Sequence, residues 1–158
     1  MLQYKYFKKG IKSLIMHNFY GHKDALLVTA VNNSYSKIIT PIDLYDALAN
    51  IWCEYSCAPR MRHLWSQNNP TLGQCSITAF LAQDIFGGKV LGIPRPDGSW
   101  HCYNCAQGHT FDLTSEQFGS EILDYSHNPE QKREIHFAKT EKLHRYLYLI
   151  EQLKKCTR

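Results

Sequence analysis

The segment GQCSITAFLAQDIFGG, residues 73–88, carries the strongest secondary-structure signal in this 158-residue chain. Its apolar side chains recur at the three- and four-residue spacing of a helix. The four that we expect to face a core are Ile77, Phe80, Leu81 and Ile85. The pair Gly87-Gly88 is typical of a helix end, because glycine readily adopts the left-handed backbone that closes a helix. The sequence therefore predicts a buried helix that begins at or just before Cys75.

Three short strands are predicted after this helix, at residues 89–93, 99–105 and 109–113. The intervening segments, 94–98 and 106–108, contain proline, glycine and polar residues and predict turns. Two successive hairpins indicate an antiparallel meander. If residues 106–108 are the pivot of the second hairpin, residues whose numbers sum to about 213 or 214 lie opposite one another.

Two further helices flank these elements. Thr40-Pro41 has the composition of a helix start, and the apolar spacing that follows predicts a helix to about Tyr55. A last helix is expected over residues 140–155. Its predicted apolar face consists of Leu143, Leu147, Ile150 and Leu153. Helices segregated from an antiparallel sheet define an α+β domain. We expect residues 1–40 to be an N-terminal extension and residues 41–158 to be a single domain.

Composition excludes several classes of protein. Hydrophobic residues make up 44% and charged residues 20% of the chain, as in globular domains. The net charge of +4 is scattered along the sequence, so no nucleic-acid partner is expected. No apolar run approaches the length of a membrane span, and no signal peptide is recognisable, so we expect a cytoplasmic protein. The even count of six cysteines then points to metal binding, catalysis or burial rather than to disulfides.

Cys75 is placed where a helix begins. Free backbone N–H groups and the positive end of the helix dipole both favour a thiolate at such a position, and the thiolate is the reactive form of cysteine. His101, in the second strand, is the candidate base. Asp112, one hairpin later, is expected beside His101, because 101 and 112 sum to 213. The chain order is thus cysteine, histidine, aspartate.

This order resembles that of the papain-like and transglutaminase-like superfamily. Residues 45–150 resemble more closely the YunG-like family of small bacterial proteins. The motifs that carry the resemblance are Trp65-Ser66, Asn69-Pro70, Gly73-Gln74-Cys75, Gly87-Gly88, His101, Asn104, Asp112-Leu113-Thr114 and Gln117-Phe118. The resemblance implies a small papain-like (NlpC/transglutaminase-like) α+β fold, with an antiparallel sheet packed against the helix that bears the nucleophilic cysteine.

The resemblance also implies roles for individual residues. Cys75 would be the nucleophile, His101 the general base and Asp112 the carboxylate that orients the histidine. Asn69 lies where papain-like enzymes carry an oxyanion-stabilising amide, and Gln74 is the alternative for that role. The chain departs from the family pattern at position 102, where a cysteine follows His101 in place of an aromatic residue.

Three residues are candidates for substrate contact. Trp65 and Trp100 are aromatic residues that would line a cleft, and Asn104 either contacts substrate or holds the sheet together. The expected activity is acyl transfer without a cofactor, by a peptidase, amidase or transglutaminase-like enzyme acting on a peptide or another amide.

Two alternatives stand beside this hypothesis. The first is a structural zinc site, in which Cys102 and Cys105 would form a half-site completed by Cys53 and Cys57. Against it, Cys102 and Cys105 point to opposite faces of a regular strand. The second is a non-catalytic binding module on the same fold, because a fold does not fix a function.

Overall fold

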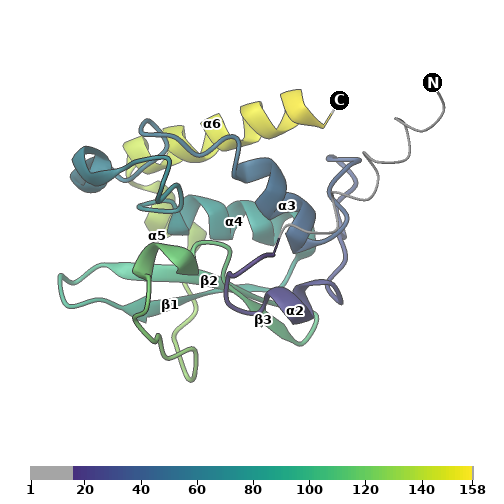
Figure 1. Cartoon of the computed structure of the whole chain (residues 1–158), viewed down its shortest axis with the longest axis horizontal. Coiled ribbons are helices and arrows are strands. Elements are labelled where there is room, and N and C mark those ends of the chain that lie inside the picture. The colour runs from purple at the N-terminus through teal and green to yellow at the C-terminus, as the bar shows by residue number, and fades with distance from the viewer. Residues whose placement is uncertain (1–15, 158) are drawn as a thin grey trace.

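The three longest helices of the protein stack on one face of a small antiparallel sheet (Figure 1). The computed structural model describes residues 16–157. Its helices are α2 (His22–Ala25), α3 (Pro41–Leu48), α4 (Cys75–Phe86), α5 (Arg133–Phe137) and α6 (Thr140–Cys156), with two 3₁₀ helices, η2 (Pro59–Leu64) and η3 (Ser115–Phe118). Its strands are β1 (Lys89–Pro94), β2 (Trp100–Ala106) and β3 (His109–Phe111).

The sheet has the strand order β1-β2-β3, and both pairings are antiparallel. Helix α4 lies between this sheet and α6, and contacts both (Figure 1). The predicted α+β class, with the cysteine-bearing helix packed against an antiparallel sheet, is therefore confirmed.

Helix α4 has the bounds that residues 73–88 predicted. The four side chains expected to face the core have no exposed surface, and most of the helix is buried around its whole circumference. Such burial is typical of a central helix covered on several sides. The helix closes at Gly87, whose φ of 73° is the left-handed backbone expected there.

Helix α3 is shorter than predicted and ends at Leu48 rather than near Tyr55. The side-chain amide of Asn50 donates to the carbonyl oxygen of Asp46, which the backbone N–H of Asn50 would bond in a continuing helix. That N–H bonds instead to the carbonyl of Ala47, three residues back, and the chain tightens into a turn. The apolar spacing continues past the helix because Trp52 is still buried.

The register of the second hairpin also differs from the prediction. Ala106 pairs with His109, so the loop holds only two residues and partner numbers sum to 215 rather than 213 or 214. Gln107 and Gly108 have φ values of 54° and 80°, the backbone that a two-residue hairpin loop requires. The Gln107 amide bonds the backbone of Thr29, which holds this unusual conformation in place.

Strand β3 ends at Phe111, short of the predicted residue 113. At Asp112 the chain leaves β2 and forms an isolated bridge with Tyr20, whose carbonyl oxygen accepts the Asp112 N–H at 3.0 Å. Residues before position 41 thus contact the sheet directly. Phe19, Ala25 and Val28 are part of the hydrophobic core. Residues 1–15 of the expected extension lie outside the described part of the chain.

The buried face of α6 is rotated from the predicted one. Tyr146, Leu149 and Leu153 are buried, whereas Leu147 is half exposed. Arg145 also lies on the buried face, where its guanidinium bonds the carbonyl oxygen of Ser56. Because Arg145 is a charged residue, a hydrophobicity pattern does not identify this face as the buried one. Within residues 16–157, no helix combines the length and apolar composition needed to cross a bilayer.

Candidate active site

Cys75 is the first residue of α4, and a tight loop that includes Gly73 precedes it. Gly73 has a φ of 70°, and a Cβ at this position would lie 2.6 Å from Sγ of Cys57, so only glycine fits. The sulfur of the partly exposed Cys75 lies 3.8 Å from the carbonyl oxygen of Trp100. The backbone N–H groups of Cys75 and Ser76 have no acceptor within residues 16–157, as is usual in a first helical turn.

His101 and Asp112 are hydrogen-bonded in the interior of the protein. His101 Nε2 lies 2.5 Å from Oδ2 of Asp112, and the two residues are 2% and 1% exposed. In the observed register they are diagonal neighbours, since Asp112 comes two residues before the position opposite His101. Diagonal neighbours share a face of the sheet and long side chains bridge the gap. The predicted partnership therefore exists although the predicted register was wrong.

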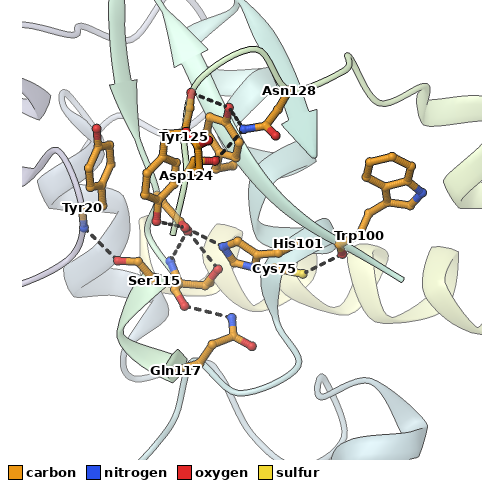
Figure 2. A network of polar contacts seen from close by, with 12 residues as sticks. Tyr20, Cys75, Trp100, His101, Ser115, Gln117, Asp124, Tyr125 and Asn128 are labelled. Atoms are coloured by element: carbon orange, nitrogen blue, oxygen red, sulfur yellow. Dashed lines mark hydrogen bonds and ion pairs between the residues drawn. The ribbon is translucent and has the colours of Figure 1, made fainter. Parts of the chain in front are cut away.

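Other donors hold the Asp112 carboxylate in place. Oδ1 accepts the backbone N–H of Thr114 at 3.0 Å and its hydroxyl at 3.2 Å. Oδ2 accepts the hydroxyl of Tyr125 at 2.8 Å in addition to His101. The Tyr125 ring stacks on Tyr20 with centroids 3.7 Å apart (Figure 2). Because His101, Thr114 and Tyr125 all act as donors, the carboxylate is fixed as an acceptor.

The other ring nitrogen of His101 faces the cysteine. Figure 2 shows the imidazole beside the sulfur of Cys75, which lies between His101 and Trp100. His101 Nδ1 is buried and has no hydrogen-bond partner of standard geometry within residues 16–157. The edge of Phe118 packs against the imidazole at a centroid distance of 4.6 Å. The ring is thus fixed between its carboxylate and Cys75, with one nitrogen left for chemistry.

The electrostatics of this arrangement favour an ion pair. Burial alone would lower the pKa of His101, but the charge and hydrogen bond of Asp112, together with Cys75, raise the pKa to about 10. The pKa of Cys75 is well below its ordinary value, because the Cys102 thiol bonds to its sulfur and His101 adds a hydrogen bond and a positive charge. Both pKa shifts favour a thiolate beside an imidazolium.

Cys102 is the second thiol of the site. It is 1% exposed, and its hydrogen bond to Cys75, followed by burial, raises its pKa well above the ordinary value. The two sulfurs thus differ in role: Cys75 carries the charge and Cys102 remains a neutral donor. This gives a physical role to position 102, where the resemblance implied an aromatic residue.

Cys75 and His101 line a cleft of about 1100 Å³. Its wall also includes η2, the turn after β1, Phe118 and the segment from Pro129 to Arg145. Trp100, which is 40% exposed, lines this cleft as predicted for a substrate contact. A volume of this size is in the range of small-molecule and peptide-side-chain sites.

The other predicted contacts lie outside the cleft. Asn69 does not line it, and the backbone N–H of Asn69 bonds the carbonyl of Ser66. The Gln74 side chain is fully buried and donates to the carbonyl of Cys53 at 3.2 Å. Neither amide reaches the space beside the Cys75 sulfur, so the oxyanion donors expected from the sequence are not brought together with the cysteine.

Asn104 and Trp65 have structural partners as well. The Asn104 amide donates to the carbonyl of Ala79 at 2.8 Å and ties β2 to α4. The Trp65 indole donates to the carbonyl of Pro70 at 3.1 Å. Of the two roles left open for Asn104, the structure shows the one that holds the sheet to its helix.

The four cysteines of the zinc alternative do not converge. The Cys53 thiol donates to the hydroxyl of Tyr148 at 3.5 Å, whereas Cys102 is a free thiol beside Cys75. Within residues 16–157, no group of three or more histidine, cysteine, aspartate or glutamate side chains is arranged to hold a metal ion. Cys102 and Cys105 belong to one strand with alternating faces, which separates their sulfurs.

Some residues around the site had no recognisable signal in the sequence. Tyr125 lies in an irregular segment without periodicity, and its contact with Asp112 depends on how that segment folds back. His136 and Lys142 reach the cleft from α5 and α6, and their spacing matches no motif. The packing of α6 on α4 brings these residues to the cleft, and no sequence pattern indicates that packing.

Comparisons with known proteins agree with the family resemblance of residues 45–150. The family model described as YunG protein matches residues 40–158. A relative from Bacillus subtilis (strain 168), named "Uncharacterized protein YunG", is 40% identical over 83 residues, which is 52% of this chain and 70% of the relative. No solved structure matches the chain. The chain belongs to the YunG protein family.

Proposed function

We propose that the protein is a cysteine-dependent acyl-transfer enzyme. The observation that carries this proposal is that Cys75 and His101 line one open cleft and that the buried Asp112 is hydrogen-bonded to His101 behind its wall. A buried carboxylate fixes the histidine, and the histidine leaves its second nitrogen beside a partly exposed, ionised cysteine. These are the parts of an activated nucleophile.

In the first half of the reaction, the Cys75 thiolate attacks the carbonyl carbon of an amide or ester. A carbon–sulfur bond forms, and the carbonyl electron pair moves to its oxygen. The free N–H groups of Cys75 and Ser76, at the positive end of α4, are placed to donate to this oxyanion. When the oxyanion collapses, the bond to the amine or alcohol breaks. The leaving group takes its proton from His101, and a thioester remains.

In the second half, neutral His101 removes a proton from water or from an amine. The resulting nucleophile attacks the thioester carbonyl, and the carbon–sulfur bond breaks. Cys75 leaves as a thiolate, and His101 keeps the proton. Attack by water gives a peptidase or amidase, and attack by an amine gives a transferase. Peptides and related amides are therefore the proposed substrate class.

The proposal includes a papain-like origin for the fold. In its support, the cysteine begins a central helix, the histidine lies on a strand and the aspartate follows the next strand. This is the chain order of that superfamily. The proposal extends to residues 41–158 as the catalytic domain, to which residues 17–40 add core side chains.

The proposal is tested with p-nitrophenyl acetate, an activated ester that needs no specific recognition. We expect a burst of nitrophenolate, one acetyl group on Cys75 by mass spectrometry, and continued turnover. Cys75→Ala removes both burst and turnover. Cys156→Ala, at an exposed cysteine at the end of α6, leaves both in place.

Two results would contradict the proposal. If Cys156 is acetylated as fast as Cys75, the Cys75 site provides no activation. If neither cysteine is acetylated while the protein is folded, Cys75 is an inert thiol and the cleft belongs to a binding module.

A further inference from the structure

One wall of the cleft carries positive charge that no carboxylate neutralises. Six lysine or arginine side chains line the cleft, against three aspartate or glutamate side chains. The arginines all have partners: Arg60 pairs with Asp97, Arg95 with Glu121 and Arg145 with Glu141. The three lysines, by contrast, form no ion pair within residues 16–157. They are Lys132, Lys139 and Lys142.

Lys142 differs from the other two lysines in being partly buried and fixed. Its ammonium lies 3.0 Å from Nδ1 of His136. An ammonium only donates, so Nδ1 is the acceptor, and the proton of this imidazole is on Nε2. Nε2 donates in turn to Oε1 of Gln131 at 3.0 Å. His136 therefore takes one N–H of the Lys142 ammonium, and the other two donors have no partner within residues 16–157.

The fixed ammonium belongs to the same site as the nucleophile. Lys142, His136 and Cys75 all line the one cleft. Burial lowers the pKa of Lys142, and the charges of Cys102 and Cys75 oppose that shift, which places both sulfurs within electrostatic reach. A half-buried cation with spare donors and no carboxylate partner is costly to maintain unless an anion binds to it.

We propose that Lys142, positioned by His136, binds a carboxylate of the substrate next to the carbonyl that Cys75 attacks. This inference rests on the proposed function and narrows its substrates to amides or esters that bear a carboxylate. The two exposed lysines, Lys132 and Lys139, lie at the same wall and would attract such an anion without fixing it. Arg60 and Arg95 are less suited, because their own carboxylates occupy them.

The test compares two alkylating reagents that differ in charge. Iodoacetate carries a carboxylate bonded to the carbon that the sulfur attacks. Iodoacetamide carries a neutral amide at the same place. Both transfer their carbon to the Cys75 sulfur and release iodide. The measured quantity is the ratio of the two rate constants at Cys75, resolved from the other cysteines by mass spectrometry, in the full-length protein at pH 7.

We expect the iodoacetate-to-iodoacetamide ratio to be higher at Cys75 than at the exposed Cys156. Lys142→Met keeps the apolar stem and should lower the ratio at Cys75 roughly five- to tenfold, as expected for loss of a nearby partly desolvated charge. Lys142→Arg should retain most of the wild-type ratio at Cys75. Lys139→Met tests the exposed lysine and should produce a smaller fall, because solvent and salt screen its charge.

The outcomes separate this inference from the function beneath it. If Cys75 alkylates rapidly with iodoacetamide but the ratio is unchanged in Lys142→Met, the carboxylate site is wrong and the nucleophile stands. An equal fall in Lys139→Met would also overturn the inference, because the charge would then act diffusely. If Cys75 reacts with neither reagent, the proposed function fails and this inference fails with it.

Discussion

Two histidines, His101 and His136, line the same cleft, and their surroundings give them different charge states. His101 is 2% exposed and His136 is 7% exposed, so burial penalises the imidazolium form of both. His101 faces the carboxylate of Asp112, and its pKa is raised to about 10. His136 faces the ammonium of Lys142, and its pKa is lowered to about 4, by burial first and by that charge second.

The difference teaches that the partner, rather than the depth, determines the role of a buried histidine. His101 holds a proton at neutral pH and can deliver it to a leaving group. His136 is neutral at the same pH, accepts a hydrogen bond from Lys142 and donates one to Gln131. The cleft thereby has a proton-transfer side and an anion-binding side, with Cys75 between residues of both. The following predictions change one side at a time.

The largest effect is expected from replacing each histidine by the same neutral residue. His101→Gln should slow iodoacetamide alkylation of Cys75 at pH 6 by on the order of 100-fold, because the pKa of the thiol returns toward its ordinary range. His136→Gln should leave this rate within the same order of magnitude. Mass spectrometry of the labelled peptides measures both. Equal losses in the two variants would show that the histidines do not differ in role.

The next effect concerns the partner of His101. Asp112→Asn keeps the shape of the side chain but removes the charge that holds the imidazolium. We expect a fall of about tenfold in the alkylation rate at pH 6, the equivalent of about one pKa unit. The thermal midpoint should change little, since an amide oxygen can still accept from Thr114. A large loss of stability at an unchanged rate would instead assign Asp112 a purely structural role.

The two histidines should also affect stability in opposite pH ranges. The raised pKa of His101 contributes stability that is complete below its ordinary value of 6.5 and is lost as the pH rises to about 10. The lowered pKa of His136 contributes stability that is complete above 6.5 and is lost as the pH falls through about 4.

Thermal midpoints across pH 4 to 10 measure this difference in the two glutamine variants. His101→Gln should be destabilised most at the acidic end, and His136→Gln most at neutral and alkaline pH. One kcal/mol corresponds to roughly 3 °C for a domain of this size. Parallel curves for the wild type and both variants would contradict the assigned pKa shifts.

The smallest effect is expected at Tyr125, whose hydroxyl donates to the Asp112 carboxylate from outside the cleft. Tyr125→Phe removes the hydroxyl that donates to Asp112 and should cost about 1 kcal/mol of unfolding free energy. Tyr55→Phe is the matched control, since Tyr55 is 51% exposed and its hydroxyl has no hydrogen-bond partner within residues 16–157. Denaturant unfolding compares the two. If both cost the same, the Tyr125 hydroxyl does not support the carboxylate.

The part of the site that local sequence determines could be predicted. The apolar repeat and the glycine stop fixed both ends of α4, and hence the placement of Cys75 at its start. The pairing of His101 with Asp112 followed from hairpin spacing. It survived an error of register, because a shift from a sum of 213 to one of 215 keeps both residues on the same face.

The remaining features depend on tertiary contacts that no local pattern records. Asn69 and Gln74 were predicted from position in the chain alone, and the loop before α4 turns Gln74 toward Cys53 instead. Tyr125 reaches Asp112 from an irregular segment. Lys142 reaches the cleft because α6 buries a face that includes an arginine, which no hydrophobicity pattern would select.

The central claim is that Cys75 and His101 form a thiolate–imidazolium pair, and nitrogen NMR of the histidine rings tests it most directly. Spectra of uniformly labelled protein from pH 4 to 10, assigned with the two glutamine variants, report the protonation of each ring. We predict that His101 carries protons on both nitrogens at pH 7 and loses one only near pH 10, while His136 carries one proton on Nε2 at pH 7. A His101 ring that is neutral at pH 7 and titrates near 6.5 would contradict the ion pair and the activation of Cys75 that depends on it.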